Sequence, residues 1–156
     1  MKPNTTNQNK LAFQLPGRKE VSRFEKIHNI TFKNAKEADA LVAQEIAEAI
    51  RGCKTEHYVL GLATGSSPIG VYKELVRLHK EEGLSFKNVV SFNLDEYFGL
   101  KAEDKQSYHS FMYTHLFDHI DISNGQIYIP KGDIKEEDVV AFCSAYEAKI
   151  ESFGGI

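Results

Sequence analysis

Residues 58–70 read YVLGLATGSSPIG, and this stretch decides the fold class. Its opening part, YVLGLA, is apolar on both faces, which is typical of a central strand in a parallel sheet. A short polar turn follows, and residues 69–83 then repeat apolar side chains at helical spacing up to Gly83. Strand, turn and helix in this order predict one unit of an α/β domain.

The same alternation extends to both sides of this stretch. Apolar periodicity predicts further strands and helices, in chain order, at residues 27–32, 35–51, 88–97, 107–120, 127–130 and 135–154. Strands that alternate with helices usually pair in parallel, because each helix carries the chain back across the sheet. We therefore predict a three-layer, Rossmann-like α/β domain with a mostly parallel sheet and helices on both faces.

The helix predicted at 35–51 has the clearest ends. Asn34 is placed to cap its N-terminus, and Gly52 is placed to end it in the left-handed conformation. Its apolar stripe is interrupted only by Glu45 and consists of Ala38, Leu41, Val42, Ile46, Ala49 and Ile50.

The composition describes one ordinary globular domain. The chain has 156 residues, of which 42% are hydrophobic and 26% are charged, and its formal net charge is -3. A chain of this length typically buries roughly 68–70% of its unfolded surface, so a core is expected without disulfides. The slight acidic excess gives no general attraction for nucleic acid or an anionic membrane, so any anion site must be local.

The two ends of the chain differ from this central pattern. Residues 1–26 are polar with scattered charge and predict a flexible N-terminal arm ahead of the domain at 27–156. The chain stops at residues 154–156 directly after a helix, which would leave a sheet edge unpaired, so we interpret it as a truncated domain. No apolar run is long enough for secretion or a membrane span, and Cys53 and Cys143 lack a CxxC spacing, so a cytoplasmic location is expected.

The turn after the quoted strand has the composition of an anion site. Parallel α/β sheets bind ligands beyond the carboxyl ends of their strands, where Thr64, Gly65, Ser66 and Ser67 lie. Gly65 lets the backbone approach a ligand, Ser67 can cap the helix, and the first N–H groups of that helix would hold a phosphate. The GK[ST] ending of a nucleotide triphosphate loop is missing, and a turn that merely caps its helix is the alternative.

Two adjacent carboxylates, Asp95 and Glu96, lie at the end of the strand predicted at 88–97. Adjacent residues of a strand point to opposite sides, so only one of them is expected to face the pocket. Partial desolvation beside a phosphate would raise the pKa of that carboxyl group and suit it to proton transfer. The alternative is a pair of solvated acids that cap something nearby.

Three histidines, His109, His115 and His119, share one predicted helix. The last two are four residues apart, which is compatible with shared metal coordination. No third ligand of suitable spacing is evident, and the aromatic residues around them favour packing and surface roles. We therefore predict no metal site.

Three segments, taken together, resemble a known family: LGLATGSSPIGVYKEL (60–75), FNLDEYFGL (92–100) and SYHSFMYTHLFDHIDI (107–122). At these separations they are similar to the N-terminal half of glucosamine-6-phosphate deaminases, from about residue 27 to residue 156. The 6-phosphogluconolactonases share the fold and the phosphate turn, but they usually carry an Arg where this chain has Tyr97. The resemblance therefore favours the deaminase branch.

This resemblance implies conversion of glucosamine 6-phosphate and water to fructose 6-phosphate and ammonia. It implies no metal or organic cofactor, a small-molecule sugar phosphate as the partner, no nucleic acid and no membrane, and it allows a homo-oligomer in the full-length protein. Asp95 would be the base that moves a proton at the carbon bearing nitrogen, and Glu96 would lie beside it. The sugar phosphate would be cradled by Thr64, Gly65, Ser66 and Ser67.

The family's second signature, which runs through Asp-Gly-His to Phe-Asn-Glu-Pro, would begin shortly after residue 156. We therefore expect the 156 residues to have little or no deaminase activity alone. Two alternatives stay open, a 6-phosphogluconolactonase-like enzyme and a non-catalytic sugar-phosphate sensor of the same fold.

Overall fold

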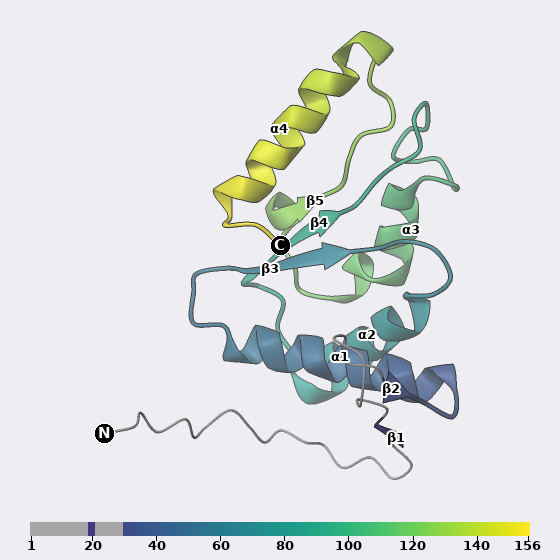
Figure 1. Ribbon diagram of the computed structural model, residues 1–156, viewed down its shortest axis with the longest axis vertical. Coiled ribbons are helices and arrows are strands. Elements are labelled where there is room, and N and C mark those ends of the chain that lie inside the picture. The colour runs from purple at the N-terminus through teal and green to yellow at the C-terminus, as the bar shows by residue number, and fades with distance from the viewer. Residues whose placement is uncertain (1–18, 21–29) are drawn as a thin grey trace.

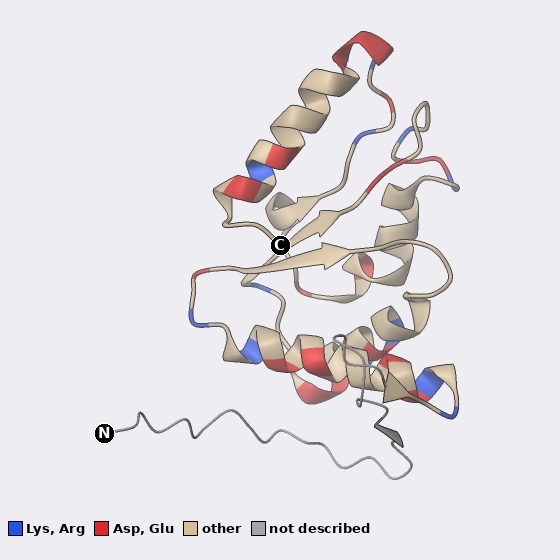
Figure 2. Ribbon diagram, in the orientation of Figure 1, with Lys and Arg blue, Asp and Glu red and all other residues tan. Residues whose placement is uncertain are grey.

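A three-stranded parallel sheet is the centre of the computed structural model, which describes residues 19–20 and 30–156 (Figure 1). Its strands are β3 (Tyr58–Leu62), β4 (Val89–Asn93) and β5 (Ile127–Tyr128), in the order β3-β4-β5. All three strands are uncharged along their whole length (Figure 2). Because they run in parallel, their carboxyl ends lie at one edge of the sheet, as the sequence predicts.

Helices cover both faces of this sheet. Helices α1 (Ala35–Gly52), α2 (Ile69–Glu82) and α3 (Tyr108–His115) pack on one face, and α4 (Val139–Ser152) lies on the other (Figure 1). The residues of β4 alternate accordingly, since Val89 joins the core beneath α1 and α2 while Phe92 contacts Tyr146 of α4. The predicted α/β class with helices on both faces is therefore confirmed. None of the helices described is long and apolar enough to cross a membrane.

The described part of the strand expected at 27–32 lies outside the parallel sheet. Instead β2 (Ile30–Thr31) pairs antiparallel with β1 (Lys19–Glu20), and Lys19 lies opposite Thr31. Strand β1 lies within the predicted arm, whose other residues, 1–18 and 21–26, are outside the described residues, as are residues 27–29.

The two predicted ends of α1 have different outcomes. The Asn34 side chain accepts a hydrogen bond from the Glu37 amide at 3.1 Å, so the predicted N-terminal cap is confirmed. The prediction for Gly52 is wrong, because Gly52 is still helical and the extended residue Cys53 follows it. The Cys53 amide donates to the Ile50 carbonyl at 3.3 Å, so the helix ends without a left-handed residue.

The buried stripe of α1 is rotated from the predicted one. Its buried residues are Ala43, Ala47 and Ile50, whereas Val42 is 42% exposed. The partner of α1 is another helix, α2, and small side chains let two helices approach closely. At Gly70 of α2 a Cβ atom would meet the carboxylate of Asp39 in α1, so the absence of a side chain there lets Asp39 fit.

The later elements are shorter than predicted. Helix α3 ends at His115, because Leu116 leaves helical geometry with φ of -140° and ψ of -63°. Its aromatic, β-branched and small polar residues have modest helix propensity, which favours an early end. Short 3₁₀ turns lie in the connections, at Phe117–His119, Asn124–Gln126 and Glu136–Asp138. Strand β4 ends at Asn93, before the two acids, and β5 ends at Tyr128.

Candidate functional site

The turn between β3 and α2 lies at the carboxyl edge of the sheet, where the sequence predicts an anion site. Gly65 has a φ of 98°, which favours glycine, and it is exposed together with Ser66 and Ser67. The hydroxyl of Tyr72 in α2 donates to the Ala63 carbonyl at the start of the turn. Burial of this tyrosine raises its pKa to about 12. The turn is therefore tied to its own helix by a buried side chain.

The start of α2 is open to a ligand. Pro68 is the cap residue and no side chain caps the helix, so the predicted capping role of Ser67 is wrong. Pro68 has helical dihedral angles, with φ of -80° and ψ of -6°, which turn the chain into the helix directly after Ser67. The first N–H groups of an α-helix have no partner within the helix, and without a side-chain cap they are available to an anion.

Glu96 is engaged with the start of α3. One carboxylate oxygen, Oε1, accepts hydrogen bonds from the amides of Tyr97 at 2.8 Å and Tyr108 at 2.9 Å. The other, Oε2, accepts from the His109 amide at 3.0 Å. Ser107 caps the same helix by accepting from the Ser110 amide at 3.0 Å. The negative carboxylate therefore lies at the positive end of the α3 dipole. For Glu96, the structure agrees with the alternative interpretation of the acidic pair, in which an acid caps a nearby element.

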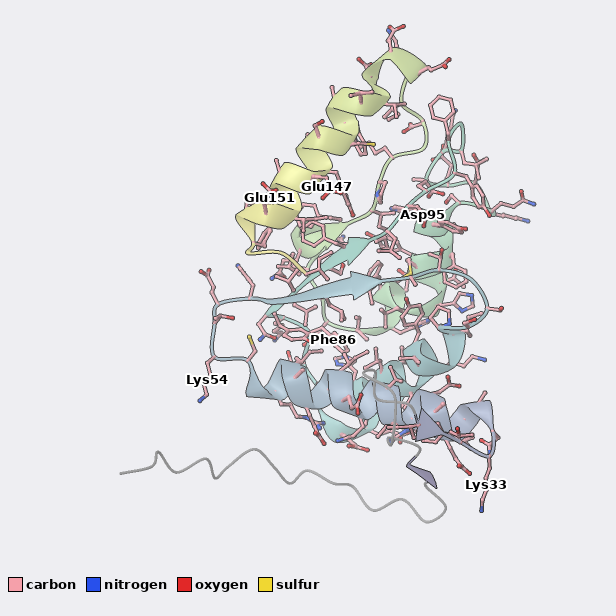
Figure 3. The ribbon with its side chains drawn as sticks, in the orientation of Figure 1. Lys33, Lys54, Phe86, Asp95, Glu147 and Glu151 are labelled. Atoms are coloured by element: carbon pink, nitrogen blue, oxygen red, sulfur yellow. The ribbon has the colours of Figure 1, made fainter. Side chains whose placement is uncertain are left out.

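Asp95 lies in the loop that follows β4 (Figure 3), and among the described residues it accepts no hydrogen bond from the start of α3. It is exposed, so the expected partial desolvation is not found in the part of the chain that is described. It lines a cavity of about 260 Å³ between the sheet edge and α4, together with Lys131 and Tyr146. Because β4 ends at Asn93, the rule that adjacent strand residues point to opposite sides does not apply to Asp95 and Glu96.

Tyr146 of α4 is a site residue that sequence reasoning missed. Its hydroxyl lies 2.8 Å from the Asn93 carbonyl and 2.9 Å from the Tyr128 carbonyl, so it holds the ends of β4 and β5 together. Burial raises the pKa of Tyr146 well above its ordinary value. The helical spacing of α4 predicts that Tyr146 faces the sheet. No local pattern in the sequence predicts that its hydroxyl bonds the carbonyls at the ends of two strands.

The turn and the acidic pair open onto different cavities. Gly65 borders a cavity of about 660 Å³, whose other lining residues are Tyr97, Phe98, Leu100, Lys105, Gln106, Ser107, Tyr108 and Phe111. Leu62 and Asn93 are paired across β3 and β4, so the two connections start side by side. Beyond that point Gly65 faces one cavity and Asp95 the other, and Phe98 borders both. The described residues therefore do not bring Asp95 and the turn into one cavity.

The three histidines make separate contacts. His109 stacks on Tyr113 with ring centroids 4.5 Å apart, and His115 lies against Phe111 at the same separation. The ring of His119 is 2.9 Å from the Thr114 carbonyl. Within residues 19–20 and 30–156, no group of three His, Cys, Asp or Glu side chains is placed to hold a metal ion.

Comparison with known proteins places this arrangement in a family. The family of glucosamine-6-phosphate isomerases and 6-phosphogluconolactonases matches residues 33–155. The chain belongs to this family. A glucosamine-6-phosphate deaminase of Bacillus velezensis is 48% identical over 126 residues, which make up 81% of this chain and 51% of that protein. A deaminase of Porphyromonas gingivalis is 57% identical over 99 residues, 64% of this chain and 37% of that one.

Solved structures of the family agree with the architecture. A monomeric glucosamine-6-phosphate deaminase superposes with a TM-score of 0.74 at 40% identity, over 80% of this chain and 50% of that one. A 6-phosphogluconolactonase from Plasmodium vivax gives a TM-score of 0.60 at 24% identity, over 77% of this chain and 40% of that one. This similarity supports the fold alone. The chain spans about half the length of the relatives it matches.

Proposed function

We propose that this chain supplies the phosphate turn and the proton-transferring carboxylate of a glucosamine-6-phosphate deaminase. The reaction converts glucosamine 6-phosphate and water to fructose 6-phosphate and ammonia. The observation that carries the proposal is the uncapped start of α2 behind Gly65, one strand away from Asp95. Relatives between 45% and 57% identical are named glucosamine-6-phosphate deaminases, which favours this branch over the lactonases.

The proposed chemistry needs one anchored anion and one base. The turn at residues 64–67 holds the phosphate, which places the open-chain sugar over the sheet edge. The carboxylate of Asp95 takes the proton from the carbon bearing the amine and returns it to the neighbouring aldehyde carbon, while a proton from the amine passes to the aldehyde oxygen, which becomes a hydroxyl group. The resulting imine takes up water, and ammonia leaves as the ketone forms. Glu96 holds the loop rather than the substrate, since its oxygens already accept three amides.

The cavity that Asp95 lines is small for a substrate site. Asp95 is exposed and lies in a cavity of only about 260 Å³, below the roughly 300–1,000 Å³ typical of small-molecule sites. We propose that the parts of the domain that match no residue of this chain complete the enclosure, and that the 156 residues alone release little or no ammonia. We place the protein in the cytoplasm, in keeping with the free thiols of Cys53 and Cys143.

Binding is the direct test of the proposed function. In a residue-resolved NMR titration of the chain with glucosamine 6-phosphate, we expect amide shifts at residues 64–67. Unphosphorylated glucosamine should leave them unmoved, and Asp95→Asn should bind as the unmodified chain does. A well-dispersed spectrum without shifts contradicts a phosphate turn in this chain. Strong ammonia release by the purified chain contradicts the expected inactivity.

A further inference from the structure

Asn93 is a buried polar residue that the proposed function does not use. It is the last residue of β4 and is 2% exposed. Its side-chain amide donates to the carbonyl of Leu62, the last residue of β3, at 3.2 Å. The turn at residues 64–67 begins just after Leu62, and the acidic loop, residues 94–100, begins just after Asn93. The side chain therefore joins two strand ends at the points where the proposed phosphate turn and the acidic loop leave the sheet.

Stability alone does not account for an asparagine at this position. The Oδ1 atom of Asn93 is buried and has no hydrogen-bond partner among the described residues. An unpaired buried acceptor costs free energy of the same order as one hydrogen bond contributes, and an apolar side chain of the same size avoids that cost. Buried polar residues can instead fix how neighbouring elements are aligned, as a single buried Asn sets the register of coiled coils.

Two tyrosine hydroxyls hold the same edge of the sheet from opposite faces. Tyr72 of α2 donates to the carbonyl of Ala63, the residue that follows β3. Tyr146 of α4 donates to the backbone carbonyl of Asn93 at 2.8 Å. These bonds tie each strand end to a helix, whereas the side-chain amide of Asn93 ties the two strand ends to each other. Asn93 is therefore placed to transmit a displacement from one segment to the other.

The spacing between these two segments matters for the proposed reaction. The turn holds the phosphate while Asp95 takes a proton from another carbon of the same molecule, so the spacing selects the carbon that is reached. A misplacement of about 1 Å can lower a rate roughly 100-fold. Asp95 and Thr64 each lie two residues beyond a strand end, and they border no common cavity in the described chain. Their spacing is therefore set through the strand ends and not through a shared cavity wall.

We propose that Asn93 is a positioning residue whose side-chain amide sets the spacing between the phosphate turn and the carboxylate of Asp95. This inference rests on the proposed function, because it says how the anchor and the base of that reaction are aligned. Asn93 contacts no substrate and acts through the Leu62 carbonyl. Without the amide, each segment keeps its own hydrogen bonds, but a change in one no longer reaches the other.

The first test follows amide chemical shifts in the 156-residue chain without ligand. Tyr72→Phe removes the hydrogen bond to Ala63 but keeps the aromatic ring, so it disturbs the turn through that bond alone. We expect it to shift the amides of residues 63–67 and, through Asn93, those of residues 94–96. Asn93→Leu keeps the size of the side chain and removes both polar atoms. In that variant, the same change at Tyr72 should shift residues 63–67 only.

Ser91→Ala is the matched control. Ser91 lies on the same face of β4 as Asn93, is fully buried, and its hydroxyl also has no partner among the described residues. In the Ser91→Ala chain, Tyr72→Phe should still shift residues 94–96. If those shifts also persist in Asn93→Leu, the strand backbone alone connects the two segments and the inference is wrong. Asn93→Ala decides the comparison if the leucine variant does not give a dispersed spectrum.

Titration with glucosamine 6-phosphate separates this inference from the proposed function. In the unmodified chain we expect shifts at residues 64–67 and weaker shifts at residues 94–96, and in Asn93→Leu those at 64–67 alone. A residue that only stabilised the fold would not separate the two sets. If both sets persist in Asn93→Leu, the proposed function stands and the role of Asn93 is wrong. If the unmodified chain shows no shifts, the proposed function is wrong for this chain, and the comparison with Tyr72→Phe still decides the role of Asn93.

Discussion

Glu96 connects two segments of the candidate site through one side chain. Its carboxylate accepts the Tyr97 amide in its own loop and the Tyr108 and His109 amides at the start of α3. Bonds between an ionised acceptor and backbone amides are stronger than neutral ones, and the helix dipole adds to them. The position of Tyr97 beside Tyr108 therefore depends on a residue that does not itself border their cavity.

The substitution Glu96→Gln should lower the free energy of unfolding by about 1–3 kcal/mol, because an amide retains one acceptor oxygen and no charge. Urea unfolding followed by circular dichroism measures this difference. Glu103→Gln, at an exposed acid in the following loop, is the control and should stay within about 0.5 kcal/mol. Equal stability of the two variants would show that the three amide bonds contribute nothing net.

The burial of Tyr72 makes the free energy of unfolding vary with pH in the alkaline range. Its pKa is raised to about 12 by burial, so the folded chain keeps the phenol proton that the unfolded chain loses near pH 10. The contribution is fully present below pH 10 and is lost as the pH rises through about 12, a change of about 2–3 kcal/mol. We expect Tyr72→Phe to remove this part of the pH dependence. Urea unfolding of both proteins at pH 8, 10 and 11 should show their stabilities converging as the pH rises, and parallel curves would contradict the prediction.

At the scale of elements, the starts of α1 and α2 differ in whether a side chain caps them. Asn34 caps α1 through its side chain, whereas α2 begins without any side-chain cap. The side-chain cap stabilises α1, whereas the first N–H groups of α2 are left to bind solvent or a ligand. The two serines before α2 therefore have no part in holding that helix.

The substitution Asn34→Ala should cost about 1 kcal/mol of stability, because it removes the acceptor for the Glu37 amide. Ser67→Ala should change stability by less than about 0.5 kcal/mol, because Ser67 caps nothing. Thermal unfolding of the two variants, monitored by far-ultraviolet circular dichroism, compares them directly. A loss at Ser67 as large as that at Asn34 would mean that the serine caps α2 in solution.

At the scale of the whole molecule, the sheet and α4 are only partly covered. Within the described residues β3 pairs with β4 alone, so one of its edges has free N–H and C=O groups. Helix α4 contains no fully buried residue, and its Val140 is 78% exposed. An open sheet edge and exposed apolar side chains each favour association between copies of a chain.

We therefore expect the 156-residue chain to self-associate weakly. Sedimentation velocity across a hundredfold range of concentration should show the weight-average mass rising with concentration. Moderate salt should not abolish the effect, because β3 contains no charged residue. A single monomeric species at every concentration would show that this edge is protected in solution.

The sequence by itself determined the order of elements, the parallel sheet, the cap at Asn34 and the two chain segments that meet the carboxyl edge. These features depend on residues close together in the chain, namely apolar periodicity, capping side chains and turn glycines. Only the tertiary structure decided which cavity each motif faces. In the folded chain Glu96 accepts amides twelve and thirteen residues away, and Tyr146 bonds the ends of two strands. Helix α1 packs on its alanines rather than on the predicted apolar stripe. Such contacts join segments distant in sequence, and their partners are set by packing and hydrogen bonding that no local pattern encodes.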